Sequence, residues 1–218
     1  MRTRYTDFNG ADAAIASMYA TPWAELEGVL AAMPLHLKAS EQDGIQGNAT
    51  FDPVGTNDYI AQALKALNWS GKIPIPEAFG SFGTDVDFAK QGMIVEVQFS
   101  NYPFLLNNTI RSQMFVRDGI VFHGAPTGVI VIVAKSGMIP SANSSLYYEQ
   151  AVNQLTALAT QGVLTAPLRM VSLYEEPGQV NATWTTYPGR TSRTIHGRET
   201  RTVTVTQGSG MKARISAT

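Results

Sequence analysis

The fold of this chain is indicated first by two neighbouring segments, Gly83-Thr-Asp-Val-Asp-Phe88 and Met93-Ile-Val-Glu-Val-Gln-Phe99. A turn at Lys90-Gln-Gly92 separates them, and β-branched residues dominate the second, so they predict two adjacent β-strands. Because side chains alternate between the two faces of a strand, Glu96 and Gln98 are expected on one face. A charged residue thus interrupts an otherwise apolar strand, where valine would be expected in a plain core strand.

Strands and helices interleave along the rest of the chain, which predicts the α/β class with a mixed central β-sheet flanked by helices. The apolar run 129–133 predicts a strand covered on both faces. Further strands are predicted at 168–174 and, more exposed, at 201–206. Four helices are predicted from apolar residues at helical spacing. The first spans 23–33, with Thr21 as N-cap and Pro34 as its stop, and the second is marked by Ile60, Leu64 and Leu67 and ends at Ser70-Gly71. The third begins at about Pro103 with Leu106, Ile110 and Met114 on one side, and the fourth is capped by Asn143-Ser-Ser145 and has Tyr148, Val152, Leu155 and Ala159 on one face. The segment 51–57 is predicted to be a turn.

The composition is that of one folded domain over residues 1–218, with 44% hydrophobic and 15% charged residues. The absence of cysteine excludes disulfides, thiolate metal sites and cysteine nucleophiles. The longest apolar run, 128–134, is too short to cross a bilayer, and residues 1–7 lack the apolar core of a signal peptide. No phosphate-loop or dinucleotide-binding motif occurs, so no nucleotide cofactor is expected. The sequence predicts a cytoplasmic protein with no membrane partner.

Positive charge is concentrated towards the end of the chain. Residues 180–218 contain six Lys or Arg and one Glu, whereas residues 1–179 contain ten Lys or Arg and sixteen Asp or Glu. A basic segment on an acidic body can form a phosphate-binding surface. The alternative is a solvated strand followed by a frayed terminus.

Two carboxylates on the adjacent predicted strands indicate a metal site. Asp87 lies on the strand next to Glu96 and Gln98, so two carboxylates and an amide oxygen are expected to converge. Such a site suits Mg²⁺, which takes one or two carboxylates and leaves positions for water and substrate phosphate. The alternative is a pair of solvated acidic residues on a half-exposed strand. The position of Glu96 favours the metal site, because a buried carboxylate is costly unless a metal or hydrogen bonds satisfy it.

Several collinear segments carry a resemblance to a known family. They are the two strands quoted above, Ser100-Asn-Tyr-Pro-Phe-Leu-Leu-Asn-Asn-Thr109, Met33-Pro-Leu-His-Leu-Lys-Ala-Ser40, Phe51-Asp-Pro-Val-Gly-Thr-Asn57, Ile73-Pro-Ile-Pro76, Asn143-Ser-Ser-Leu-Tyr-Tyr-Glu-Gln-Ala151, Thr185-Thr-Tyr187 and Ser192-Arg-Thr-Ile195. These segments resemble the BglII-like type II restriction endonucleases, in the BamHI/BglII branch of the PD-(D/E)XK nucleases. The resemblance covers residues 33–195, and the chain after about residue 198 is unlike the family.

The resemblance implies a restriction-endonuclease-like core with a metal-dependent site. Asp87, Glu96 and the main chain of Val97 are expected to bind the metal ion, and Asp87, Glu96, Gln98 and Lys72 to form the catalytic site. Gln98 stands where the wider superfamily has a lysine. Because glutamine cannot act as a general base, the attacking water must be activated by the metal and a substrate phosphate. Lys72 replaces an asparagine of the family. Its side chain could therefore contact a phosphate, contact Glu96, or be exposed to solvent.

The resemblance also implies a homodimeric deoxyribonuclease that cuts double-stranded DNA at a palindrome. The helices from about Pro103 and from Asn143 are expected to pack across the dimer axis. The family pattern implies base-reading residues at Ser100, Asn101, Asn143, Ser144 and Arg193. Asn can pair with adenine and Arg with guanine in the major groove, so these residue types suit that role. Thr191 replaces a tyrosine of the family, so one phosphate contact is expected to be missing. The predicted site is AGATCT, cut to leave four-base 5′ overhangs and 5′-phosphates.

Several alternative functions stay open, and the family implies a metal cofactor and a functional partner. The same enzyme class could read GGATCC or RGATCY, the chain could be a catalytically inactive DNA-binding protein, or Asp87 and Glu96 could be the paired carboxylates of a glycoside hydrolase. Mg²⁺ is the expected cofactor, with Mn²⁺ substituting and Ca²⁺ supporting binding without cleavage. A host DNA methyltransferase is the expected functional partner. His36, which lies within a family segment, is expected to be a hydrogen-bonded structural residue.

Overall fold

The computed structural model describes residues 1–139, 146–189, 191–207 and 213–217. Its centre is a six-stranded sheet with the order β1-β10-β9-β6-β5-β4. Strand β9 runs parallel to β6 and β10, whereas the other neighbours are antiparallel. The strands span Arg2–Phe8 (β1), Ser70–Pro74 (β4), Asp85–Lys90 (β5), Met93–Val97 (β6), Val129–Lys135 (β9) and Leu168–Tyr174 (β10). The predicted α/β class with a mixed central sheet is therefore confirmed.

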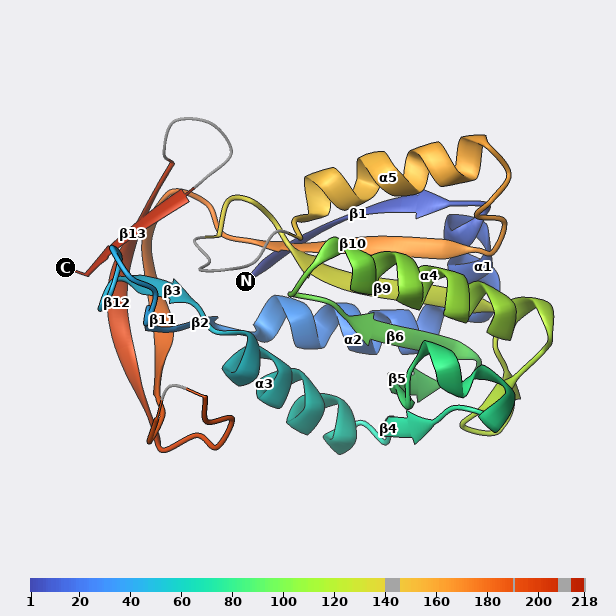
Figure 1. The fold of residues 1–218 in the computed structure, drawn as a ribbon, viewed down its shortest axis with the longest axis horizontal. Helices are drawn as coiled ribbons and strands as arrows, with labels where there is room; N and C mark the ends of the chain where they lie inside the picture. The colour runs from blue at the N-terminus through green and yellow to red at the C-terminus, as the bar shows by residue number, and fades with distance from the viewer. Residues whose placement is uncertain (140–145, 190, 208–212, 218) are drawn as a thin grey trace.

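Helices cover both faces of this sheet (Figure 1). They span Ala11–Met18 (α1), Ala20–Ala32 (α2), Pro53–Ala66 (α3), Tyr102–Arg117 (α4) and Tyr148–Thr160 (α5), with a 3-10 helix at Glu77–Phe82 (η1). Side chains of α1, α2 and α3 share one apolar cluster with Val95 and Val131, and those of α4 and α5 share a second with Ile94 and Ile132. Successive residues of β6 and β9 thus enter opposite clusters, which is why residues 129–134 of β9 are all apolar. No helix in the described part of the chain is both long and apolar enough to cross a membrane.

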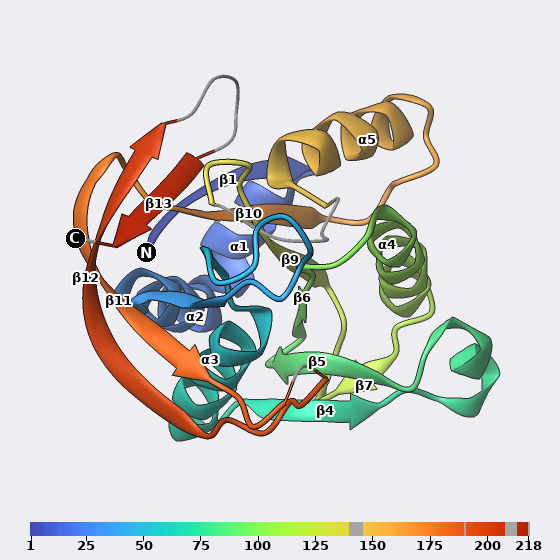
Figure 2. The ribbon, with the colours of Figure 1, turned by 60° about the vertical axis from the view of Figure 1, so that its left-hand side comes forward.

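A second sheet lies at one end of the molecule, with the order β13-β12-β11-β2-β3 (Figures 1 and 2). Its strands span Leu35–Ala39 (β2), Ala49–Phe51 (β3), Gly178–Thr186 (β11), Gly197–Gln207 (β12) and Ala213–Ala217 (β13), and a small hairpin is formed by Val121–Phe122 (β7) and Ala125–Pro126 (β8). The single late strand predicted at 201–206 is thus the middle of β12. Since β12 pairs with β11 on one side and β13 on the other, the described residues 197–207 and 213–217 form sheet, and the alternative of a frayed terminus does not hold for them.

Two predicted helix starts are wrong. Helix α2 begins at Ala20 with Tyr19 as its N-cap, so Thr21 lies inside the first turn. The amide of Trp23 donates to the carbonyl of Tyr19, the residue that ends α1, and the two helices follow one another almost directly. Helix α5 begins at Tyr148 with Tyr147 as its N-cap, so the predicted cap at 143–145 is also wrong, and those residues lie outside the described part of the chain.

The segment around α3 also differs from the prediction. Residues 51–57 are not a turn, because Asp52 caps α3 by accepting a hydrogen bond from the amide of Val54 at 3.2 Å, and Pro53 is the first helical residue. The helix ends at Ala66, and Ser70, predicted to lie at its end, begins β4. The turn between β5 and β6 is confirmed, with Gln91 and Gly92 both at positive φ.

Candidate active site

The structure brings Asp87 and Glu96 together on adjacent antiparallel strands. Phe88 of β5 pairs with Val95 of β6, which sets Asp87 opposite Glu96. The side chain of Asp87 accepts a hydrogen bond from the amide of Val97 at 2.7 Å. Burial raises the pKa of both carboxyls. The charge of Asp87 raises the pKa of Glu96 further, and the charge of Asp85 raises that of Asp87. Two carboxylates in this position therefore favour the binding of a cation.

Glu96 has a partner that the sequence did not reveal. Its side chain is 2% exposed, and Oε1 accepts a hydrogen bond at 2.5 Å from Nη2 of Arg111, a buried residue of α4. Nη1 of Arg111 donates to the carbonyl of Phe82 at 3.2 Å. Burial raises the pKa of Glu96 more than the guanidinium lowers it. One signal was present in the sequence, because Arg111 is the single charged residue between 97 and 116.

The amide of Gln98 is held from both sides. Its Nε2 donates to the Ser100 hydroxyl at 2.5 Å, and its Oε1 accepts from Nδ2 of Asn108 at 3.2 Å. Asn108 belongs to α4 and was not identified from the sequence. Gln98 is buried directly after β6, the strand that carries Glu96, and these two hydrogen bonds fix its side chain.

Lys72 lies at the edge of a cavity of about 450 Å³ that also contains Asp87 and Val97. It stands between Gly71, which pairs with Phe88, and Ile73, so its backbone is opposite Asp87. Lys72 is exposed, has a positive φ of 50°, and its charge lowers the pKa of Asp87 against the larger effect of burial. The remaining lining residues are Asn57, Ala61, Lys65, Trp69, Gly71 and Phe88.

The residues present fit a hard divalent cation. In the described part of the chain no group of three or more His, Cys, Asp or Glu side chains is placed to hold a metal ion. Mg²⁺ does not need such a group, because it binds one or two carboxylates and retains water or substrate oxygens. Asp87 and Glu96 supply the carboxylates, and they open on the cavity through Asp87. The donor set therefore suits Mg²⁺ better than a metal that prefers imidazole or thiolate.

The predicted base-reading residues lie at three places. Ser100 and Asn101 are exposed directly after β6 and before α4. Arg193 is exposed in the loop between β11 and β12. Asn143 and Ser144 lie outside the described residues. The roles of all five stay predictions.

Part of the basic segment is neutralised within the fold. Arg198 forms an ion pair with Asp58 of α3. Arg201 donates to Glu199 and stacks over the ring of Trp184, with 4.1 Å between its Cζ and the ring centroid. Charge in 180–218 therefore also stabilises the second sheet.

His36 is buried, as expected of a structural residue, but its ring forms no hydrogen bond with the described part of the chain. Its side chain lies near Tyr59 with 5.6 Å between ring centroids. Neither ring nitrogen has a hydrogen-bond partner among the described residues. Burial lowers the pKa of His36 to about 4, so the ring is neutral in the folded protein near pH 7.

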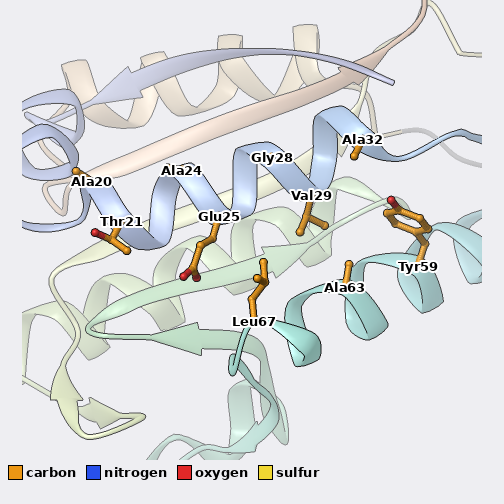
Figure 3. Close-up of a pocket in the computed structure, with 10 residues that line it drawn as sticks. All are labelled: Ala20, Thr21, Ala24, Glu25, Gly28, Val29, Ala32, Tyr59, Ala63 and Leu67. Atoms are coloured by element: carbon orange, nitrogen blue, oxygen red, sulfur yellow. The ribbon is translucent and has the colours of Figure 1, made fainter.

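A second cavity, of about 710 Å³, is lined by residues of α2 and α3 (Figure 3). Neither Asp87 nor Glu96 lines it. Small apolar side chains of α2 form much of its wall. Glu25, which also lines it, is already bonded to Lys90 and to the indole of Trp69. The carboxylate in this lining is therefore already engaged.

The fold and the site define a class, and comparison with known proteins agrees. The family described as restriction endonuclease BglII/BglIII matches residues 3–173. The type II restriction enzyme BglII of Bacillus subtilis is 46% identical over 202 residues, which are 92% of this chain and 89% of that protein. The chain is thus a type II restriction endonuclease. It belongs to the BglII/BglIII restriction endonuclease family, which confirms the resemblance and the enzyme class and removes the glycoside hydrolase alternative.

Two crystal structures are similar over the full length of both chains. Restriction endonuclease BglII complexed with a DNA 16-mer superposes with a TM-score of 0.95 at 43% identity. Free BglII superposes with a TM-score of 0.77 at 41% identity. The backbone described here is therefore more similar to the DNA-bound relative than to the free one.

Proposed function

We propose that this chain is a Mg²⁺-dependent, homodimeric endonuclease that cuts double-stranded DNA at AGATCT and leaves four-base 5′ overhangs with 5′-phosphates. The observation that carries the proposal is the pair of half-buried Asp87 and buried Glu96, opposite each other on adjacent strands in a fold superposable on a DNA-bound BglII. The adjacent strands, the cavity and the cationic Lys72 at its edge support a site for a metal ion and a phosphate. An inactive DNA-binding protein would have no reason to retain these carboxylates.

In the proposed mechanism the chain holds and orients the reacting groups. Asp87, Glu96 and the main-chain carbonyl of Val97 would hold Mg²⁺, while Arg111 fixes the Glu96 carboxylate. When bound there, Mg²⁺ polarises the scissile phosphodiester and lowers the pKa of water. Gln98 has no titratable proton at neutral pH, so it orients water and cannot accept its proton. Lys72 would hold a phosphate oxygen at the edge of the cavity.

We propose that five residues read the bases in the major groove, namely Ser100 and Asn101 after β6, Asn143, Ser144 and Arg193. The central GATC is the better supported half, because the outer A·T pair depends on fewer contacts. GGATCC and RGATCY are the alternative sites. We further propose that residues 1–218 form one endonuclease domain whose basic segment 180–218 contributes to DNA contacts.

Helix α4 supports the proposed dimer. Its core side is formed by Leu105, Thr109, Ser112 and Phe115. Phe104 and Ile110 are 55% and 42% exposed, so the side predicted from Leu106, Ile110 and Met114 is only partly covered by the protomer. A two-fold dimer can read a palindrome with one half-site per subunit. The proposed setting is the bacterial cytoplasm, where a cognate methyltransferase would protect host DNA.

The test is digestion of DNA of known sequence with Mg²⁺, followed by mapping of the cut ends. Asp87→Ala and Glu96→Ala should each abolish cleavage while leaving specific DNA binding largely intact. Ca²⁺ should support binding without cleavage, Mn²⁺ should replace Mg²⁺, and EDTA should stop the reaction. Asp85→Ala is the matched control, because Asp85 lies on the same strand and its carboxylate accepts from Thr84. Full cleavage by either active-site variant would contradict the metal assignment, and ends without a GATC core would contradict the recognition proposal.

A further inference from the structure

Lys135, the last residue of β9, is a fully buried lysine outside the catalytic group. Its side chain is 0% exposed. Nζ donates to the carbonyl of Leu146 at 2.8 Å and to the carbonyl of Phe99 at 3.2 Å. It also lies 4.8 Å from the ring centroid of Tyr147. Burying an ammonium costs free energy unless hydrogen bonds satisfy it, so a lysine at this position needs a structural or functional explanation.

The two carbonyls belong to segments that meet at the end of the central sheet. Phe99 directly precedes Ser100 and Asn101, and Leu146 leads into α5. The amide of Leu146 donates to the carbonyl of Ser100 at 3.1 Å, which closes the same junction. Lys135 therefore connects the end of β6 to the start of α5 through two main-chain carbonyls.

We propose that Lys135 is a positioning residue for DNA recognition, which fixes the backbone that presents Ser100 and Asn101 to the bases. The inference rests on the proposed recognition role of these two residues. Reading a base edge requires side chains held to within about 0.5 Å by their support. An ammonium supplies several donors to carbonyls from different segments, which an apolar side chain of the same length cannot do. The lowered pKa of Lys135, about 8, results from burial and accords with its enclosed position.

The experiment uses the absence of cysteine from this chain, so that Lys135→Cys introduces a single thiol. The variant is alkylated in denaturant and refolded, either with 2-bromoethylamine, which restores an ammonium at the same length, or with 1-bromopropane, which places a methyl group there. Wild-type protein taken through the same steps is the refolding control. The readout is kcat/KM at the mapped wild-type site divided by kcat/KM at each single-base variant of it.

We expect the propylated protein to lose about tenfold or more of this ratio, in line with the discrimination of a bidentate base contact. The aminoethylated protein should recover the wild-type ratio to within about threefold. The loss should fall at the base pairs that Asn101→Ala also relaxes, whereas a merely structural defect lowers all rates together and leaves the ratios unchanged. Lys135→Met, produced directly, is a second variant that needs no refolding.

Arg169→Met is the matched control, because Arg169 is a buried cation of the neighbouring strand β10 that is paired with Asp7. It should lower thermal stability without changing the ratios. Wild-type ratios in the propylated protein or in Lys135→Met would overturn the inference, as would a loss that the aminoethyl group does not restore. The proposed function fails separately, if the wild-type protein itself shows no preferred site with a GATC core.

Discussion

His36 makes the stability of this protein depend on pH. Burial holds its pKa at about 4, whereas an unfolded histidine titrates near 6.5. Between these values the unfolded chain binds more protons than the folded chain, so the free energy of unfolding falls as the pH falls. The loss begins near pH 6.5 and is complete below about pH 4. Between pH 7 and pH 5 it amounts to about 2 kcal/mol.

The measurement is urea unfolding of wild type and His36→Gln at pH 7 and pH 5. The wild type should lose about 2 kcal/mol more than the variant, because glutamine has no proton to gain. His196→Gln serves as the control, since His196 is exposed, and it should follow the wild type. Equal losses in wild type and His36→Gln would show that His36 is protonated in the folded protein without cost.

Residues differ in how much of their role could be predicted from sequence. Asp87 and Glu96 were predictable as neighbours, because a two-strand hairpin fixes which residues face each other. Arg111 was not, because its contact with Glu96 depends on how α4 crosses β6, and helix periodicity does not specify that crossing. The unpaired nitrogens of His36 were also beyond prediction, since they reflect where β2 and α3 meet and not the residues beside His36 in the chain.

Gly83, the C-cap of the short helix η1, leaves the space that the Arg111 side chain occupies. Gly83 has φ of 139°, which other residues rarely adopt, and an added Cβ would collide with Nη1 of Arg111. Arg111 is buried and bonded to Glu96 and Phe82, so it cannot move without losing those bonds. Gly83→Ala should therefore lower the free energy of unfolding by about 2 kcal/mol and reduce the cleavage rate.

Gly80→Ala is the matched variant within η1, because an added Cβ there meets nothing within 4 Å. It should change the free energy of unfolding by less than about 0.5 kcal/mol and leave cleavage unchanged. Both are measured by urea unfolding and by cleavage of the mapped site. If the two alanine variants behaved alike, the close approach of Gly83 to Arg111 would have no energetic consequence.

Helix starts show where local patterns are insufficient. Thr21-Pro22 has the residue types of an N-cap and first position, yet α2 already begins at Ala20. Tyr19, the C-cap of α1, is also the N-cap of α2, and its carbonyl accepts a hydrogen bond from the amide of Trp23. Proline is tolerated in the first turn because its missing N–H has no helical acceptor there, so the pattern does not distinguish one position from the next. At α3 the cap is Asp52, whose carboxylate also accepts from the Tyr187 hydroxyl at 2.7 Å, a contact from the residue that follows β11 far along the chain.

At the scale of the whole molecule, strands with a clear local pattern could be predicted from the sequence, whereas the pairing of strands far apart in the chain could not. The central strands β5, β6, β9 and β10 were predicted because each is an apolar or alternating run. The second sheet was not, since β2 pairs in parallel with β11 from the other end of the chain, Leu35 with Ala182. Its strands are short or half-exposed and carry many threonines, so no local pattern indicates which of them are neighbours.

The partly uncovered side of α4 leads to the last prediction, which concerns assembly. Ile110 is 42% exposed, so Ile110→Asp should leave the fold of the protomer intact. In a two-fold dimer the same aspartate would enter the interface twice, where two unpaired carboxylates would lose solvent and repel each other. We therefore expect sedimentation velocity to show a dimer for wild type and a dimer at least about tenfold weaker for Ile110→Asp. Met18→Asp is the control, because Met18 is 67% exposed on α1, on the opposite face of the sheet, and its dimer should be unchanged. A wild-type monomer both free and on DNA would contradict the proposed dimer, and an unaffected Ile110→Asp dimer would place the interface elsewhere than on α4.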